Sequence, residues 1–246
     1  MLPSTTFLHS NKLLTSLPRE CQAVITAYLD FVELRAGQVL SQYGQKLKHI
    51  YFPTTAALSI RSLLENGGEI DVAEVGMDGT NGALAAIGFL ASPYSHRVQI
   101  AGHAYRMDVR YFTLMVENNL DFRRACLLYL NYMYTQTAQN TVCVKHHTVH
   151  ARVCRWLLTH ADMVGGNIVI ATQQEIGDSL GSRREGITEV MANLVDNEVV
   201  RHTRGAVEIV DLQAVRNQAC VCYPLLKTAI NQTFPSQYRE RDTVLT

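Results

Sequence analysis

Apolar residues recur three or four positions apart between residues 172 and 197, and this spacing predicts two short amphipathic helices. Thr172 begins a T-x-x-E capping box before the first helix, and Gly181 follows that helix at a position that favours positive φ. Ser182 begins a similar box, S-R-R-E, before the second helix. The second helix carries one apolar stripe, formed by Ile187, Val190, Met191 and Leu194. The pattern therefore predicts a capped helical pair with a buried face.

The residues around this pair are patterned as well. A helix is expected over residues 149–163, with Val153, Trp156 and Leu157 in its core, and a short strand over 168–170. After the pair, a strand begins at Val199, residues 201–205 form a turn, and residues 206–210 return as a second strand. A capped helix follows over 211–219. A helix pair followed by a two-stranded hairpin predicts a winged helix, whereas the alternative is an ordinary helical hairpin with a solvated charged face.

In the N-terminal part of the chain, the spacing of apolar residues is typical of β-strands. Residues 11–29 predict one or two short helices interrupted at Pro18, and short apolar runs separated by Gly-containing turns follow. Such spacing is typical of an all-β sandwich or barrel. The runs cover residues 32–37, 38–44, 49–53, 57–63, 70–75 and 98–102.

A long helix is predicted over residues 119–147, which contain neither Pro nor Gly. Alternating spacings of three and four residues mark a heptad seam along it. The seam consists of Leu127, Leu130, Tyr134, Thr137, Thr141 and Val144, and continues to Thr148. Two interpretations stay open: the helix forms a dimer interface through this seam, or it packs on its own β-domain.

Charged side chains on the helical pair point to DNA. In a helix-turn-helix module, the N-terminal residues of the second helix contact base edges in the major groove. Arginine there can bind guanine O6 and N7, and glutamate can accept from the cytosine amino group, while the tip of a basic wing can reach phosphates. The predicted DNA contacts are Arg183, Arg184, Glu185, Thr188, Glu189, Thr172, Gln173, Arg201 and Arg204.

The motif T-Q-Q-E-I-G-x-x-L-G-x-x-R-E-x-[IV] resembles the DNA-binding domain of the Crp/Fnr superfamily of bacterial transcription regulators. The resemblance places the family's base-reading Arg and Glu on Arg184 and Glu185. Its third base-reading position, usually a second basic residue, falls on Glu189 and departs from the pattern. Arg183, where the family often has a small residue, is expected to supply a cationic contact instead.

The strand region resembles the cyclic-nucleotide-binding β-roll of the same superfamily. The resemblance rests on N-x-L-L-x-x-L-P, L-x-x-G-Q-V-L, I-Y-F-P and E-V-G-M-D-G, in that order. Nucleotide-binding members carry a phosphate cassette with a Glu between its glycines and an Arg followed by a small hydroxyl residue and Ala. Residues 76–83 and 95–98 lack both features, and a missing hydrogen-bond partner costs about 1–3 kcal/mol, so cyclic AMP and cyclic GMP are not expected as effectors.

The glycine-rich loop could still bind another anion through its backbone amides, and the alternative is a plain series of β-turns. The candidate ligand contacts are Gly76, Gly79, Thr80, Asn81, Gly82 and Arg97.

Composition and charge narrow the function classes. The six cysteines are scattered, which favours a reduced cytoplasm, and Cys220-x-Cys222 alone is a weak metal signal, so no metal or other cofactor is predicted. No apolar run is long enough to span a membrane and no secretory signal opens the chain, so the expectation is a cytoplasmic protein. Since no nucleophile motif, Walker loop or metal triad is present, an enzyme is not expected.

The chain has 22 basic and 22 acidic residues, and from residue 149 onward ten Lys/Arg stand against eleven Asp/Glu. DNA binding must therefore rely on local clusters of arginine and should be sensitive to salt.

The sequence thus predicts an α+β protein: a β-roll sensor over residues 1–118, a dimerisation helix and hinge over 119–148, and a winged-helix head over 149–246. The expected function is a dimeric, sequence-specific transcription regulator whose recognition helix, about residues 183–196, lies in the major groove. Expected partners are palindromic double-stranded DNA, a second copy of the chain, RNA polymerase and a small-molecule or nucleotide effector. The alternatives are an effector-free constitutive DNA binder and a sensor of another nucleotide, such as a cyclic dinucleotide.

Overall fold

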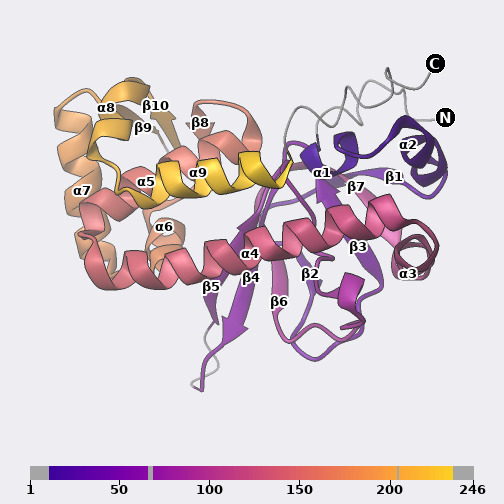
Figure 1. Ribbon diagram of the computed structural model, residues 1–246. Helices are drawn as coiled ribbons and strands as arrows, with labels where there is room; N and C mark the ends of the chain where they lie inside the picture. The colour runs from indigo at the N-terminus through magenta and orange to yellow at the C-terminus, as the bar shows by residue number, and fades with distance from the viewer. Residues whose placement is uncertain (1–10, 66–68, 204, 235–246) are drawn as a thin grey trace, which may run out of the picture.

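A computed structural model describes residues 11–65, 69–203 and 205–234 (Figure 1). The elements before the long helix are α1 (Lys12–Thr15), α2 (Arg19–Thr26), β1 (Asp30–Leu34), β2 (Val39–Ser41), β3 (His49–Pro53), β4 (Ala57–Leu63), β5 (Glu69–Val75), η2 (Ala85–Ile87), β6 (Ser95–Ile100), β7 (Gly102–Asp108) and α3 (Val109–Asn118). The elements after the long helix are given below.

The strands form two antiparallel sheets, with orders β1-β7-β3 and β2-β6-β4-β5. This confirms the predicted β-rich N-terminal region and adds β7, which the strand pattern did not predict. Its consecutive residues Ala104 and Tyr105 are both buried, so β7 lacks the simple alternation of a half-exposed strand. The roll closes on an aromatic core in which the rings of Phe112 and Phe122 lie 5.4 Å apart.

The predicted long helix is confirmed as α4 (Leu120–His146), which begins where Asn119 accepts a hydrogen bond from Phe122 N. One face of α4 packs on the roll; Tyr129 and Tyr132 are buried there, and Gln136 accepts from Glu74 N at 3.0 Å. The heptad seam lies on another face, where Leu127, Tyr134 and Val144 are 40%, 75% and 58% exposed. Thr137 and Thr141 are exposed and Leu130 is half-buried. Packing on the roll and the dimer contact expected along the seam therefore use different faces of α4.

The C-terminal half contains α5 (Val149–Val164), β8 (Ile168–Val169), α6 (Gln173–Leu180), α7 (Arg184–Asp196), β9 (Val200–Thr203), β10 (Ala206–Ile209) and α8 (Leu212–Gln218). The strands form a small sheet in the order β8-β10-β9, which confirms the predicted hairpin beside a helical pair. The stripe Ile187, Val190, Met191 and Leu194 is buried as predicted.

The two expected capping boxes have different outcomes. Thr172 and Glu175 form the first one, with both reciprocal hydrogen bonds present. The second prediction is wrong: the N-cap of α7 is Arg183, which makes no side-chain cap. α7 begins at Arg184, one residue later than an N-cap at Ser182 requires, so Ser182 lies outside the cap position and its Oγ donates to Leu180 O in the preceding turn.

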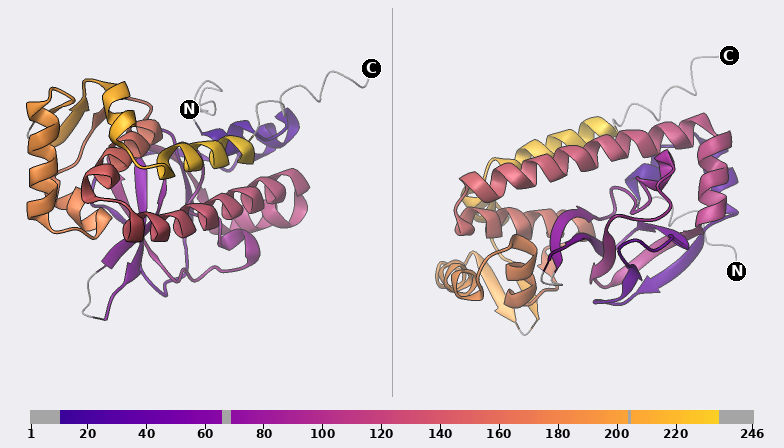
Figure 2. Two further views of the ribbon diagram at one scale, coloured as in Figure 1. Left: turned by 60° about the vertical axis from the view of Figure 1, so that its left-hand side comes forward. Right: turned by 90° about the horizontal axis from the view of Figure 1, so that it is seen from below.

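The last helix, α9 (Cys222–Thr233), was not predicted; it returns along α4 toward the β-roll (Figures 1 and 2). Ile230 reaches the core of the roll, and the ring of Phe234 stacks on that of Tyr129 with centroids 6.4 Å apart. The sequence assigned this segment to the winged-helix head, but α9 connects the head to the roll. None of the helices in the described parts of the chain is long and apolar enough to cross a bilayer.

Candidate nucleic-acid interface and effector cavity

The first turn of α7 forms an exposed, charged end. Gly181 turns the chain between α6 and α7 at φ +58°, and the missing side chain of Gly177 lets the helices approach, since a Cβ there would lie 3.1 Å from Ser182 O. Arg183, Arg184 and Glu185 are exposed, and their side chains make no hydrogen bond or ion pair with the rest of the described chain. α7 lies on the side of the head away from the β-roll in all views (Figures 1 and 2). Two arginines and one carboxylate are thus free to meet another molecule.

The other predicted contacts of the helical pair lie beside this end. Thr172 is exposed at the cap of α6, and Thr188 Oγ1 donates to Gln173 Oε1 at 2.8 Å. This bond fixes the start of α6 against the first turns of α7, so it positions the exposed arginines. Glu189 is exposed on the same helix.

The wing brings one predicted arginine to the surface. Arg201 on β9 is exposed and forms an ion pair with Glu208 on β10, with 2.6 Å between Nη1 and Oε2. Exposed pairs of this kind contribute about 0–1 kcal/mol, so Arg201 can exchange this partner for a phosphate. Arg204, also predicted as a contact, lies outside the described residues.

Residues 151–217 match the family model of the Crp-like helix-turn-helix domain. Solved structures extend the similarity over both halves of the chain. A Crp/Fnr-family protein from Eubacterium rectale is 16% identical, with 84% of this chain and 96% of that one covered and a TM-score of 0.62. Residues 151–217 are thus similar to a Crp-like helix-turn-helix domain, and the chain as a whole shares the fold of a Crp/Fnr-family structure.

Two further structures share the fold of this chain. FixK2 from Bradyrhizobium japonicum is 13% identical with a TM-score of 0.66, covering 78% of this chain and 98% of its own. The c-di-GMP-responsive regulator CLP from Xanthomonas campestris is 13% identical with a TM-score of 0.61, covering 78% and 99%. Among curated proteins no match was found. The matched family model describes a helix-turn-helix domain, so the similarity at residues 151–217 is to a DNA-binding module.

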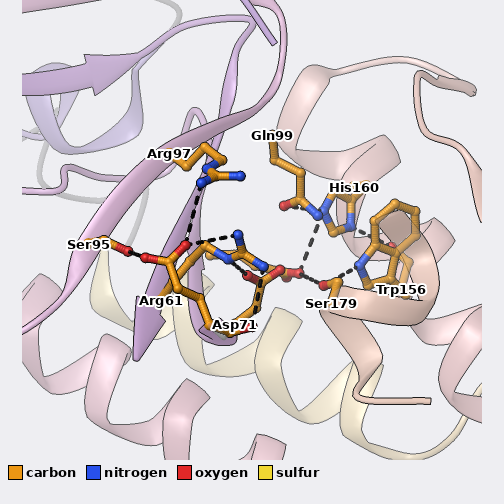
Figure 3. Close-up of polar contacts among 10 residues, drawn as sticks. Arg61, Asp71, Ser95, Arg97, Gln99, Trp156, His160 and Ser179 are labelled. Carbon is orange, nitrogen blue, oxygen red and sulfur yellow. Dashed lines mark hydrogen bonds and ion pairs between the residues drawn. The ribbon is translucent and has the colours of Figure 1, made fainter. Parts of the chain in front are cut away.

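A buried polar network holds the DNA head against the β-roll (Figure 3). From the head, the Trp156 indole donates to Ser179 Oγ at 2.9 Å, and Ser179 Oγ donates to Glu74 of β5 at 3.5 Å. His160, fully buried, places Nε2 3.5 Å from the Glu74 carboxylate and 3.1 Å from Gln99 Oε1 of β6. Because α6 carries Ser179, this network links the first helix of the DNA-binding pair directly to the sensor sheet.

The network continues as ion pairs across the outer face of the roll. Arg61 contacts Asp71 at 2.8 Å and Glu69 at 3.1 Å, while Arg97 contacts Glu69 at 3.5 Å. Burial raises the pKa of Asp71 and the nearby charge of Glu74 raises it further, against the opposing effect of Arg61. Arg97, a predicted ligand contact, is therefore engaged with Glu69 in this network.

A cavity of about 200 Å³ lies between the roll and α4. Its wall is mostly apolar, and none of the described residues that form it is an Asp, Glu, Lys or Arg. Of the six predicted ligand contacts, only Asn81 lines it. The wall comprises Leu47, Ile60, Val72, Ala73, Asn81, Ala83, Leu84, Phe89, Ser92, Tyr94, His96, Leu130, Met133, Tyr134 and Thr137.

The glycine-rich loop is packed rather than open. A Cβ on Gly79 would lie 1.8 Å from the ring of Tyr129, and one on Gly82 would lie 2.4 Å from Ile50. Gly76 meets Met163 of the head in the same way, at 2.5 Å. The loop thus uses its glycines for contact with α4, β3 and α5, and the structure does not bring it together with Arg97 in one cavity.

Polar residues of the loop bind its own roll. Thr80 Oγ1 donates to Tyr51 O at 2.8 Å, and Asn81 Oδ1 accepts from Tyr51 N at 2.8 Å. Also on the cavity wall, His96 Nδ1 lies 2.6 Å from Ser41 Oγ. Burial lowers the pKa of His96 to about 4, so the imidazole is uncharged at neutral pH. Sequence reasoning missed His96, because its position on the cavity side of β6 follows only from the pairing of that strand.

Proposed function

We propose that this chain is a transcription regulator of the Crp/Fnr type that binds a palindromic DNA site as a homodimer, with the N-terminal end of α7 in the major groove. The observation that carries the proposal is the set of exposed, unpartnered side chains Arg183, Arg184 and Glu185 on a buried helical frame. Arginine matches the two acceptors of guanine, and glutamate matches the cytosine amino group. Thr172, Gln173, Thr188 and Glu189 border the same edge, and Arg201 and Arg204 are assigned to the phosphates.

A second copy is proposed to pack along α4. The seam of Leu127, Leu130, Tyr134, Thr137, Thr141 and Val144 leaves apolar side chains in solvent, of which Tyr134 is 75% exposed. Pairing two such helices about a two-fold axis removes these side chains from water and presents two recognition helices to half-sites about 34 Å apart. A single recognition helix reads few base pairs, so dimerisation also supplies specificity.

The cavity supports an uncharged, largely apolar effector. A phosphate buried there would have no cationic side chain to compensate it, and an uncompensated buried charge is strongly unfavourable. Tyr134 and Thr137 belong both to the cavity wall and to the α4 seam, so an occupant touches the proposed dimer interface directly. Such a ligand shifts the two heads only if it binds their two arrangements unequally.

CLP responds to c-di-GMP, and this favours testing a cyclic dinucleotide as the alternative effector. A nucleotide of that class would have to bind elsewhere than the uncharged cavity, on basic residues of the surface. An effector-free, constitutive regulator is the remaining alternative. RNA polymerase is a proposed partner of the DNA-bound dimer.

Selection from a random pool of double-stranded DNA tests the central part of this proposal. The expected result is a palindrome with half-sites one helical turn apart, bound by a dimer in analytical ultracentrifugation. Enrichment of no sequence, or binding by a monomer, would contradict it. Thermal melting of the dimer against small apolar compounds and cyclic mono- and dinucleotides then separates the effector alternatives, because a ligand at about 100 times its Kd adds roughly 2.7 kcal/mol of stability.

A further inference from the structure

Three buried cysteines meet where α4, the DNA head and α9 join. Cys143 lies near the C-terminal end of α4, and Cys220 and Cys222 lie at the link from α8 to α9. Their Sγ atoms all lie within 4.8 Å of one another, and those of Cys143 and Cys220 are 3.5 Å apart. The thiols are no more than 5% exposed. Folding therefore adds a third sulfur, 77 residues away, to the C-x-C pair visible in the sequence.

The spacing of the three sulfurs matches a metal site. Thiolates that bind one ion at about 2.3 Å in a trigonal plane stand about 4 Å apart, close to the separations here. Within the part of the chain that the structure describes, no His, Asp or Glu joins the group as a fourth ligand. Structural zinc almost always takes four ligands, whereas soft thiolates also select monovalent copper, which is satisfied by three.

Two buried arginines supply the matching charge. Arg152 and Arg155 are 6% and 7% exposed, and both interact electrostatically with the cysteines. Their Nε atoms have no hydrogen-bond partner among the residues that are described. Three thiolates with one monovalent cation carry two negative charges, and the two guanidinium groups carry two positive ones. Buried charge is tolerated when it is compensated in this way.

An outer contact orients one of the sulfurs. Gln139, one turn before Cys143 on α4, donates from Nε2 to Cys222 Sγ at 3.1 Å. Hydrogen bonds of this kind to a ligating atom hold the ligands of a metal site in place. A backbone hydrogen bond also holds the cluster in place, since Cys220 N donates to Ala151 O at the start of α5.

We propose that Cys143, Cys220 and Cys222 form a site for one Cu(I) ion. On binding, three thiols release three protons to solvent and three Cu–S bonds form, with no change in the oxidation state of copper or sulfur. The ion would join the end of α4 to the start of α9 and would thereby stabilise the connection between head and roll. Binding of the ion does not depend on the proposed DNA function.

The test uses the full chain, reduced and metal-free under anaerobic conditions, with Cu(I) supplied in competition with bathocuproine disulfonate. Absorbance of the chelator complex reports the copper that the protein leaves behind. The expected result is one Cu(I) per chain and a higher melting temperature. Cys143→Ser, Cys220→Ser and Cys222→Ser should each lower the affinity at least about 100-fold. Cys126→Ala, which removes a buried thiol of the same helix outside the cluster, should bind like the unmodified chain.

Failure to compete with the chelator, or binding by all three serine variants as tight as by the unmodified chain, would overturn the proposal. Loss of two thiols on mild oxidation without copper uptake would do the same, because the cluster would then be a disulfide site. X-ray absorption at the copper edge of the unmodified protein is decisive even where a variant does not fold. Three sulfur neighbours are expected, and two, four or nitrogen-containing shells contradict the site.

Discussion

Acidification should destabilise this protein through one buried histidine of the cavity wall. His96 is 3% exposed, and burial lowers its pKa from 6.5 to about 4. Because the folded pKa lies below the unfolded one, the unfolded chain binds more protons as the pH falls through 6.5. The contribution of uncharged His96 to the free energy of unfolding is therefore full above pH 6.5 and is lost progressively toward pH 4. Between pH 7.5 and pH 5.0, these two values correspond to a loss of about 2 kcal/mol.

The assay compares urea unfolding of the unmodified chain and of His96→Gln at the two pH values. Glutamine cannot titrate, so its variant should lose about 2 kcal/mol less on acidification, equivalent to roughly 4–8 °C in melting temperature. Carboxylates such as Asp71 titrate in both proteins and cancel in the comparison. Equal losses in the two proteins would refute the argument, because His96 would then not be held neutral by burial.

Three further predictions rest on packing. Gly79→Ala should destabilise the chain by about 1–3 kcal/mol in urea unfolding, because its Cβ would overlap the Tyr129 ring, whereas the helical control Gly186→Ala, with open space around it, should not destabilise it. Ser179→Ala should cost about 1–3 kcal/mol and raise hydrogen exchange in α6, because the buried Trp156 indole loses its acceptor; unchanged exchange would contradict the role of the network. Tyr134→Glu should give a monomer at micromolar concentration in analytical ultracentrifugation, and a dimer that survives it would exclude the α4 seam.

Local physics made much of this fold predictable from the sequence. Helix caps, turn glycines and helix continuity depend on neighbouring residues. Each appears as expected, at Thr172, at Gly181 and along residues 119–147. The second capping box failed because α7 begins one residue later than the S-R-R-E spacing predicts, with Arg183 at its N-cap, and spacing alone does not fix such a boundary.

Features that depend on distant contacts could not be read from the sequence. α9 is stabilised by packing on α4, and the composition of this segment alone does not predict that it returns to the roll. The cavity wall and the cysteine cluster likewise join segments that are distant in the sequence; Cys143 and Cys220 are 77 residues apart. The glycines of residues 76–82 were interpreted as a possible anion cradle, but a sequence cannot show that Tyr129, Ile50 and Met163 occupy the space beside them.

DNA binding by Arg184→Ala tests the central claim most directly. Fluorescence anisotropy on the selected palindrome at fixed salt compares it with Arg19→Ala, which removes the same charge from an exposed site on α2. The account predicts that Arg184→Ala weakens binding by about 1–3 kcal/mol, roughly 5- to 150-fold, and relaxes base choice, while Arg19→Ala binds like the unmodified chain. Unchanged affinity and base choice in both Arg184→Ala and Arg183→Ala would contradict the assignment of α7 as the recognition helix.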